Sequence, residues 1–257
     1  MGEQTLFPLP VRVRFCDPSD LGTADAGQIC RCDDGLDYMV KDDKCGVGGA
    51  LTPHAEWFCT RLAELVGIAS PQAKIVQMDD GARWFGSRWE GGTLAGGRWW
   101  ERVGSGEIPL SDISGTLSRI YVFDQFISNP DRHVSNFLVR DQYNGVAVLA
   151  FDYSRAWICD GFPPDPEPLH PTTKTVVVQR YLRNLWGENY IIAAEAKDMA
   201  SRLGQVPVSA IQTIIEDHPK EWLPSEIKAA ILEWWSSPLL KERSEAIAKG
   251  VEDGSYL

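Results

Sequence analysis

The sequence lacks the segments that place a protein in a membrane or on nucleic acid. None of its apolar runs approaches the roughly 20 residues that cross a bilayer. Its first residues, Met1 to Gln4, lack the basic and apolar stretches of a secretory signal. No run of Lys or Arg occurs, and the net charge of −11 disfavours polyanionic partners. We therefore expect a cytoplasmic protein that contacts no nucleic acid directly and no membrane.

The cysteines do not form two metal-binding knuckles. Cys30 and Cys32 are separated by one residue and Cys45 follows, a spacing that leaves zinc as one interpretation. No second pair of cysteines follows, and no histidine lies close by. We expect free thiols instead, as in most cytosolic proteins. This prediction covers Cys16, Cys30, Cys32, Cys45, Cys59 and Cys159.

One stretch combines a polar loop with a β-hairpin. Residues 129–136 read Asn-Pro-Asp-Arg-His-Val-Ser-Asn, and two β-prone apolar runs follow, separated by a turn that ends in Asn-Gly. Antiparallel pairing places Asn136 opposite Ala150, so Asp152 lies just beyond it on the same rim. Asp131, five residues before Asn136, can reach over that rim from the loop.

These residue types suit phosphoryl transfer. Kinases orient the acceptor hydroxyl with an Asp and hold Mg²⁺ with an Asn five residues later and a second Asp after a hairpin. Mg²⁺ prefers hard oxygen ligands, and it usually takes only one or two protein carboxylates. The alternative is an ordinary turn, because Asn-Pro-Asp is a strong turn signal. The hairpin, the Asp that ends it and the apolar helical segment before the loop favour the phosphotransfer site.

A lysine and a glutamate in the N-terminal part extend this hypothesis. Residues 28–41 predict a hairpin with an Asp-Gly turn, and Lys41 ends its second strand. Such a lysine reaches the nucleotide phosphates in kinases, although it could equally be an ordinary strand-end lysine, and Lys44 is a rival. A helix is predicted from Thr52, its N-cap. Glu56, in its predicted first turn, would pair with Lys41, or it would be there only because the helix dipole stabilises an acidic side chain near the N-terminus.

Other nucleotide contacts are less specific. The small-residue loop at 21–27 could lie over phosphates through its backbone N–H groups, but its spacing matches neither a Walker loop nor the Gly-rich kinase loop. Residues 87–92 are predicted to form a hinge whose backbone would bind adenine. Within it, Arg88 and Trp89 are candidate contacts, and Trp89 or Trp84 would form a wall of the cleft.

Composition changes abruptly near residue 90. The Gly-rich stretch that continues to Gly106 predicts a linker or mobile loop. Helical spacing with prolines at the boundaries predicts a mainly helical C-terminal part. Strands are expected over 11–15, 73–78 and 82–89, and helices over 111–128, 175–186, 190–203, 209–217, 225–236 and 239–249.

Together these residues resemble the HipA-like kinase family, which belongs to the wider superfamily of protein kinases and phosphatidylinositol kinases. The resemblance runs from about Gln28 to Lys249. Tyr-Met-Val-Lys at 38–41 is similar to the family's lysine strand, and Asp-Arg-His-Val-Ser-Asn at 131–136 to its Asp-x-His-x-x-Asn loop. The second Asp is followed by Tyr-Ser instead of Phe-Gly, so the eukaryotic activation-loop switch is not implied.

The resemblance implies an α+β, two-lobed protein kinase-like fold. A small N-terminal β lobe with one helix would span residues 1–90, and a larger, mainly helical catalytic lobe 91–257. The implied activity is ATP- and Mg²⁺-dependent transfer of the γ-phosphate to a Ser or Thr hydroxyl of a protein, with an antitoxin or regulatory protein as a further partner.

The resemblance also assigns roles. It implies that Asp131 is the catalytic base or the group that orients the acceptor hydroxyl, that Asn136 and Asp152 are Mg²⁺ ligands, and that Lys41 contacts phosphates with support from Glu56. Three alternatives stay open: a kinase acting on a small molecule or a lipid, a pseudokinase that only binds partners, and an enzyme that transfers AMP.

Overall fold

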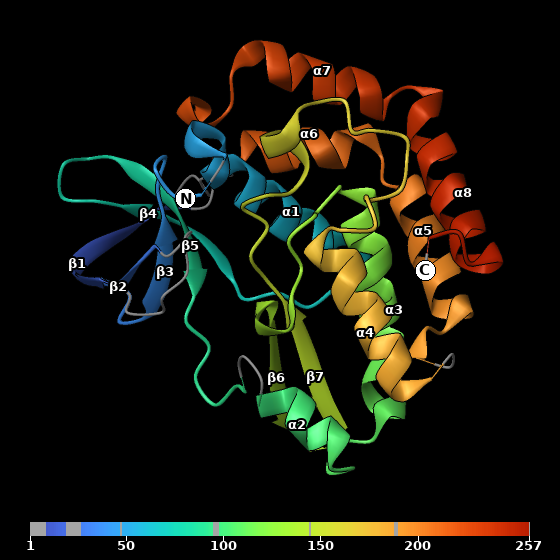
Figure 1. Cartoon of the computed structure of the whole chain (residues 1–257). Helices are drawn as coiled ribbons and strands as arrows, with labels where there is room; N and C mark the ends of the chain where they lie inside the picture. The colour runs from blue at the N-terminus through green and yellow to red at the C-terminus, as the bar shows by residue number, and fades with distance from the viewer. Residues whose placement is uncertain are drawn as a thin grey trace, which may run out of the picture.

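The computed structural model describes residues 9–18, 27–46, 48–94, 98–143, 145–187 and 190–256. Strands occupy the N-terminal part of the chain and helices most of the C-terminal part (Figure 1). The α+β prediction is therefore confirmed in outline. The small-residue loop proposed to cover phosphates falls at 21–27, of which only Gly27 lies within the described residues.

Five N-terminal strands form a closed barrel. The strand order is β1-β2-β3-β5-β4, with β1 and β4 parallel and the other neighbours antiparallel. Alternate residues point inward, as the pleat requires, so that Tyr38 and Val40 lie inside with Cys30 and Val76. The strands are β1 Val11–Pro18, β2 Gln28–Cys32, β3 Asp37–Lys41, β4 Ala73–Gln77 and β5 Arg83–Arg88.

Helix α1, Thr52–Val66, is buried on almost every side. It packs against β4 and β5 and also against C-terminal helices (Figure 1). Gly67 ends it in the left-handed conformation, at φ 88°, as a C-terminal glycine does. The predicted cap was wrong, because Leu51 precedes the helix and the Thr52 hydroxyl instead donates to the Cys45 carbonyl at 2.7 Å.

The remaining helices enclose one large apolar core. Aromatic rings fill its centre, where Trp157 lies against Phe58, Phe126, Trp234 and Trp235. The 3-10 helices are η1 Gly49–Leu51, η2 Val134–Asn136, η3 Trp157–Asp160 and η5 Lys220–Trp222. The α-helices are α2 Arg98–Gly104, α3 Leu110–Phe126, α4 Lys174–Trp186, α5 Ala193–Gly204, α6 Val208–Glu216, α7 Ser225–Trp235 and α8 Pro238–Asp253. No helix in the described part of the chain is long and apolar enough to span a membrane.

The Gly-rich stretch before residue 106 is not only a linker. It contains α2, whose Trp99 is fully buried and donates its indole N–H to the Val134 carbonyl at 2.9 Å. Two tryptophans and a valine give this short segment enough apolar surface to pack against the rest of the protein, where Trp99 contacts Phe137 of the hairpin. The high glycine content of the surrounding sequence led to the prediction of a loop instead.

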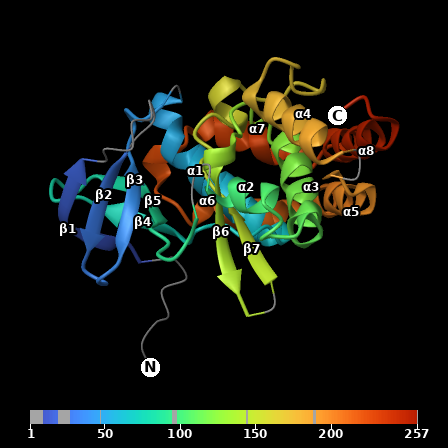
Figure 2. The same cartoon turned by 60° about the horizontal axis from the view of Figure 1, so that its bottom comes forward.

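The predicted hairpin is present as β6 Phe137–Gln142 and β7 Gly145–Ala150 (Figure 2). Its register differs from the prediction by one residue, because Phe137 pairs with Ala150 where Asn136 was expected to do so. The connection is three residues shorter than the assumed five-residue turn, since Gln142 already pairs with Gly145.

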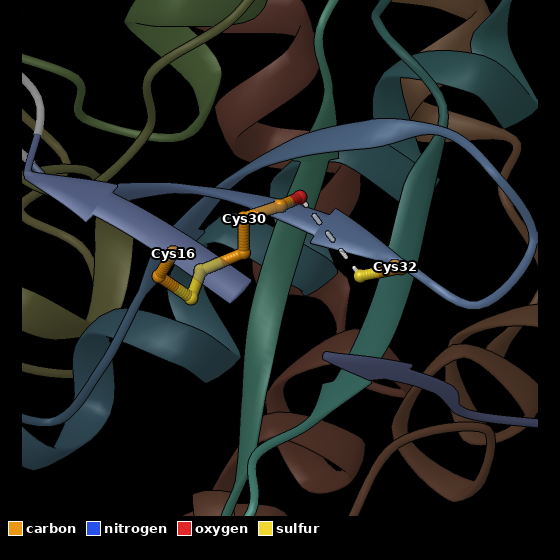
Figure 3. Close-up of a disulfide and its surroundings, with 3 residues drawn as sticks. All are labelled: Cys16, Cys30 and Cys32. Carbon is orange, nitrogen blue, oxygen red and sulfur yellow. Dashed lines mark hydrogen bonds between the residues drawn. A yellow bond between two sulfur atoms is a disulfide. The ribbon is translucent and has the colours of Figure 1, made fainter. Parts of the chain in front are cut away.

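The prediction of six free thiols was wrong. Cys16 of β1 faces Cys30 of β2 at a Cα–Cα distance of 4.0 Å, and their sulfurs form a disulfide (Figure 3). Sequence spacing cannot supply disulfide connectivity, which here arises from strand register. Cys32, Cys45 and Cys59 are free thiols, and burial raises the pKa of the Cys32 thiol to about 11.

A buried histidine pair joins α1 to the segment before η5. His54 Nδ1 lies 2.8 Å from His218 Nε2, and His218 Nδ1 lies 2.8 Å from the Pro219 carbonyl. Because a carbonyl only accepts, His218 donates a hydrogen bond through Nδ1. Its Nε2 therefore accepts a hydrogen bond from His54 Nδ1. Burial lowers the pKa of His54 far below its usual value and that of His218 to about 4.

We expect this pair to make stability fall as the pH drops from 7 to 5. An unfolded histidine takes up a proton near pH 6.5, whereas native His218 resists it down to about pH 4. The unfolded state therefore binds more protons in this window, which lowers the free energy of unfolding by about 2 kcal/mol for His218 alone. Urea unfolding at both pH values would show it. His218→Gln should flatten the slope and His170→Gln, at an exposed site, should not; equal slopes in all three proteins would contradict the prediction.

Candidate active site

Three predicted side chains from distant parts of the chain meet in one buried contact. Lys41 Nζ, at the end of β3, lies 2.5 Å from Glu56 Oε1 on α1 and 2.7 Å from Asp152 Oδ1 after β7. The side chains of Lys41 and Glu56 are 9% and 2% exposed, whereas that of Asp152 is 25% exposed. The lysine is thus shielded, and the aspartate stays open to solvent.

Electrostatics keep this contact ionised. Burial by itself would lower the pKa of Lys41, but the carboxylates of Asp152 and Glu56 outweigh burial and raise it. Burial also works against an ionised Asp152, yet Lys41 and the Ser154 hydroxyl hold its pKa well below the usual range. Burial raises the pKa of Glu56, an effect that Lys41 partly offsets. At neutral pH the site therefore presents a charged lysine and an ionised aspartate.

The backbone at Asp152 has an uncommon conformation next to this contact. Asp152 has φ 65°, a left-handed conformation that is uncommon for residues other than glycine but is tolerated by aspartate. The next amide, Tyr153 N, donates to Glu56 Oε2 at 3.0 Å, and Ser154 Oγ donates to Asp152 Oδ1 at 2.9 Å. Glu56 therefore binds Lys41 with one oxygen and the turn after Asp152 with the other.

Asp131 lies in the loop between α3 and β6. Its backbone N–H donates to Asn129 Oδ1 at 3.2 Å, and its carbonyl accepts from Asn136 Nδ2 at 3.3 Å. Its carboxylate, 16% exposed, lies 2.7 Å from Lys174 Nζ and 3.6 Å from Arg155 Nε. The loop thus presents Asp131 between two cations, neither of which sequence reasoning had placed at the site.

Arg132 anchors the Asp131 loop to helix α3 and to the hairpin. It lies within the Asp-x-His-x-x-Asn motif, but sequence reasoning did not predict a role for it. Its guanidinium forms a bidentate salt bridge with Asp124 of α3, in which the Nε–Oδ2 and Nη2–Oδ1 distances are both 2.9 Å. It also donates to the carbonyl of Asn136, one candidate metal ligand, and to that of Phe151, the residue before the other candidate, Asp152. Both Arg132 and Asp124 are buried.

The start of α4 fixes the same loop from the other side. Thr175 Oγ1 donates to the Asn129 carbonyl at 2.5 Å and accepts from Arg132 N at 2.9 Å, while Thr175 N donates to the Pro130 carbonyl at 3.2 Å. Pairs 43 to 46 residues apart leave no periodic signal. Only the run Thr-Thr-Lys-Thr at 172–175, an ordinary helix start, marked this segment in the sequence.

Asn136 and Asp152 offer oxygen donors that fit Mg²⁺. Phe151 N donates to the Asn136 carbonyl at 3.3 Å, which brings the Asn136 and Asp152 backbones together at the rim of the hairpin. The Asn136 amide nitrogen is used on Asp131, so its amide oxygen is the atom left to bind a cation. An amide oxygen and a carboxylate are hard ligands of the kind Mg²⁺ takes together with phosphates. Among the described residues, no group of three or more His, Cys, Asp or Glu side chains is placed to hold a metal ion.

Two backbone N–H groups of the proposed hinge already donate hydrogen bonds within the protein. Arg88 N donates to the Gln72 carbonyl at 3.0 Å, and Trp89 N donates to the Asp37 carbonyl at 2.8 Å. Neither amide is available to an adenine. The Trp89 side chain is 47% exposed and that of Arg88 40%, so both can still line a cleft. Their role as nucleotide contacts stays a prediction.

A sequence model of the HipA-like kinase family matches residues 16–234. The chain belongs to this family. The match includes the Lys41, Glu56 and Asp152 contact and the whole Asp131 loop. No protein with a curated description matches the sequence.

Three solved structures are similar to the chain to different degrees. The Helicobacter pylori proinflammatory kinase CtkA is 13% identical with a TM-score of 0.58, over 96% of this chain and 99% of that one. HipA of Shewanella oneidensis MR-1, solved with HipB and operator DNA, is 12% identical with a TM-score of 0.48, over 80% and 57% of the two chains. WaaP in complex with acyl carrier protein is 14% identical with a TM-score of 0.44, over 90% and 89%. The CtkA comparison shows a kinase-like fold for almost the whole length of the chain.

Proposed function

We propose that this HipA-like chain is an ATP- and Mg²⁺-dependent protein kinase that transfers the γ-phosphate to a Ser or Thr hydroxyl. The observation that carries the proposal is the Lys41 ammonium group held between Glu56 and Asp152. Active protein kinases require such a lysine–glutamate pair and a metal-binding aspartate together. The barrel and the helical part would form two lobes, divided near residue 90, with this contact between them.

Each side chain has a task that follows from its position. ATP with Mg²⁺ supplies the transferable phosphoryl group and neutralises its charge. Lys41 stands ready to bind phosphate oxygens, and Glu56 fixes its direction. Asn136 and Asp152 would hold the cation by their side-chain oxygens. Asp131 would accept a hydrogen bond from the acceptor hydroxyl, while Lys174 lies close enough to offset charge beside it.

The test is incubation with ATP and Mg²⁺ followed by intact mass spectrometry. A gain of about 80 Da per phosphoryl group on the protein or on an added Ser/Thr substrate mixture is expected. Chelation of Mg²⁺ by EDTA should abolish the gain and Mg²⁺ should restore it, because the protein offers only two ligands and relies on the cation to offset phosphate charge. A gain of AMP mass, or transfer that survives EDTA, would refute the proposal.

Glu56→Gln should slow phosphoryl transfer by about 10- to 100-fold. The variant keeps the shape of the side chain but removes a charge-assisted hydrogen bond of about 1.5–3 kcal/mol, so Lys41 is directed by Asp152 alone. Steady-state rates against ATP concentration would measure the loss. Glu64→Gln, on the partly exposed side of the same helix, is the matched control and should behave as wild type. Equal rates for Glu56→Gln and wild type would remove Glu56 from the site.

A further inference from the structure

Helix α4 carries an apolar stripe that the described residues leave about half exposed. Val177, Tyr181 and Leu185 are spaced by four residues and therefore lie in a row on one side of the helix. They are 50%, 47% and 51% exposed. Large apolar side chains exposed singly need no explanation, but three in a row form a patch of the kind that binds partners.

The same exposed side of α4 is basic in an otherwise acidic protein. The chain has 36 acidic and 25 basic residues, yet no Asp or Glu occurs in α4. Lys174 and Arg180 are exposed there, and Arg180 forms no ion pair with any residue that the structure describes. We call the surface made by Lys174, Val177, Arg180, Tyr181 and Leu185 the α4 face.

The α4 face leads away from the candidate active site. It starts at Lys174, whose ammonium group lies 2.7 Å from Asp131. Leu185 is eleven residues further on, about 16 Å along the helix axis. The helix lies on the surface beside α3 (Figure 1), and Trp100 of α2 packs against Tyr181 with ring centroids 5.1 Å apart. A molecule that covers this face therefore ends next to Asp131.

We propose that the α4 face docks the acceptor protein by an acidic amphipathic helix. This inference rests on the proposed function, because it names the class of acceptor for the same site. A row of side chains at four-residue spacing forms the ridge that packs into the grooves of another helix. Leu and aromatic anchors bind such a ridge, and Glu or Asp around them complement Lys174 and Arg180. A helix seated there would bring its flanking segment, with the acceptor hydroxyl, to Asp131.

Two other occupants fit the face less well. An anionic membrane would meet only two basic side chains, while the net charge of −11 would repel the surface as a whole. A second copy of this chain would need an acidic apolar helix, but in the part of the chain that the structure describes the exposed large apolar residues outside α4 lie singly on different elements, such as Leu65 on α1 and Leu239 on α8.

The test uses two labelled peptides and needs no knowledge of the natural acceptor. Both are amphipathic helices of about 18 residues with Leu at four-residue spacing; one carries Glu and the other Lys at the remaining positions. Fluorescence anisotropy should show that the Glu peptide binds at least about tenfold more tightly than the Lys peptide. The triple variant Val177→Ser/Tyr181→Ser/Leu185→Ser should weaken Glu-peptide binding at least about tenfold. Leu239→Ser, an exposed leucine on α8, is the matched control and should bind as wild type.

Several results would overturn the inference. These are equal binding of the two peptides, no binding at about 100 µM, and binding unchanged in the triple variant. A triple variant that loses affinity for phosphatidylserine vesicles, or that changes the oligomeric mass in light scattering, would assign the face to a membrane or a second copy instead. Thermal unfolding of the triple variant verifies that it is folded.

Peptide binding is measured without ATP, so the two proposals fail separately. Phosphoryl transfer without peptide binding refutes the docking surface and leaves the proposed function. Peptide binding that requires the α4 face, in a protein that transfers no phosphate, refutes the proposed function and the acceptor role of the bound helix.

Discussion

Asp131→Asn is expected to lower the rate of phosphoryl transfer by about 10²- to 10⁴-fold. The change keeps the size of the side chain and its backbone hydrogen bonds to Asn129 and Asn136, but it removes the negative charge that would accept the proton of the acceptor hydroxyl. ATP contacts assigned to Lys41, Asn136 and Asp152 are untouched. Affinity for ATP should therefore stay within about twofold while the maximal rate falls.

Single-turnover phosphoryl transfer and equilibrium ATP binding, measured on the same protein samples, separate these two quantities. Asp141→Asn is the matched control, since Asp141 is an exposed carboxylate in β6 that pairs with Arg102 on the surface. A maximal rate near that of wild type in Asp131→Asn would exclude Asp131 as the base. Loss of ATP affinity instead would make it a nucleotide-binding or structural residue.

Two cationic side chains beside Asp131 affect what the Asp131→Asn rate measures. Lys174 Nζ and Arg155 Nε lie 2.7 and 3.6 Å from the carboxylate. Such contacts place positive charge where a transferred phosphoryl group would pass. Removal of the Asp131 charge therefore alters the proposed base and also removes a counter-charge from both cations, so the rate measured for Asp131→Asn reports the whole cluster.

The sequence was sufficient to name the three side chains at the centre of the site and to predict the Lys41–Glu56 pair, but not the contact between Lys41 and Asp152. Lys41, Glu56 and Asp152 could be named because each has a local marker: the end of a strand, a position near the start of a helix and the end of a hairpin. Their contact follows once the strands and α1 are correctly placed. The hairpin register was wrong by one residue, yet Asp152 still reached the rim because its left-handed backbone turns it toward Lys41.

The residues that sequence reasoning missed act through long-range contacts. Asp124 fits the helical spacing of α3 and appeared to be a core-facing position, but its partner Arg132 lies beyond the end of that helix. Thr175 and Lys174 come more than 40 residues after the loop they fix. Such pairs depend on how α3, α4 and the hairpin pack, which periodicity does not encode. The Cys16–Cys30 disulfide was missed because it depends on the register of β1 and β2, which the spacing of cysteines does not give.

Asp124→Ala should lower the free energy of unfolding by about 3–5 kcal/mol, because it leaves the Arg132 guanidinium buried without a counter-charge. The loss is a large part of the 5–15 kcal/mol that typically stabilises a domain. Urea unfolding midpoints would measure it, with Asp124→Asn as a milder variant if the alanine protein is unfolded. Asp112→Ala, an exposed carboxylate in the first turn of the same helix, should cost no more than about 1 kcal/mol.

The double variant Asp124→Leu/Arg132→Met separates stability from positioning. Apolar residues of similar volume leave no unpaired charge, so most of the stability lost in Asp124→Ala should return. Activity should not return, because Arg132 also donates to the carbonyls of Asn136 and Phe151 and so places both the Asn136 side chain and the turn before Asp152. A stable double variant with wild-type rates would show that the buried pair serves folding alone. A stable variant with a rate at least about tenfold lower would establish Arg132 as the residue that positions the proposed metal ligands Asn136 and Asp152.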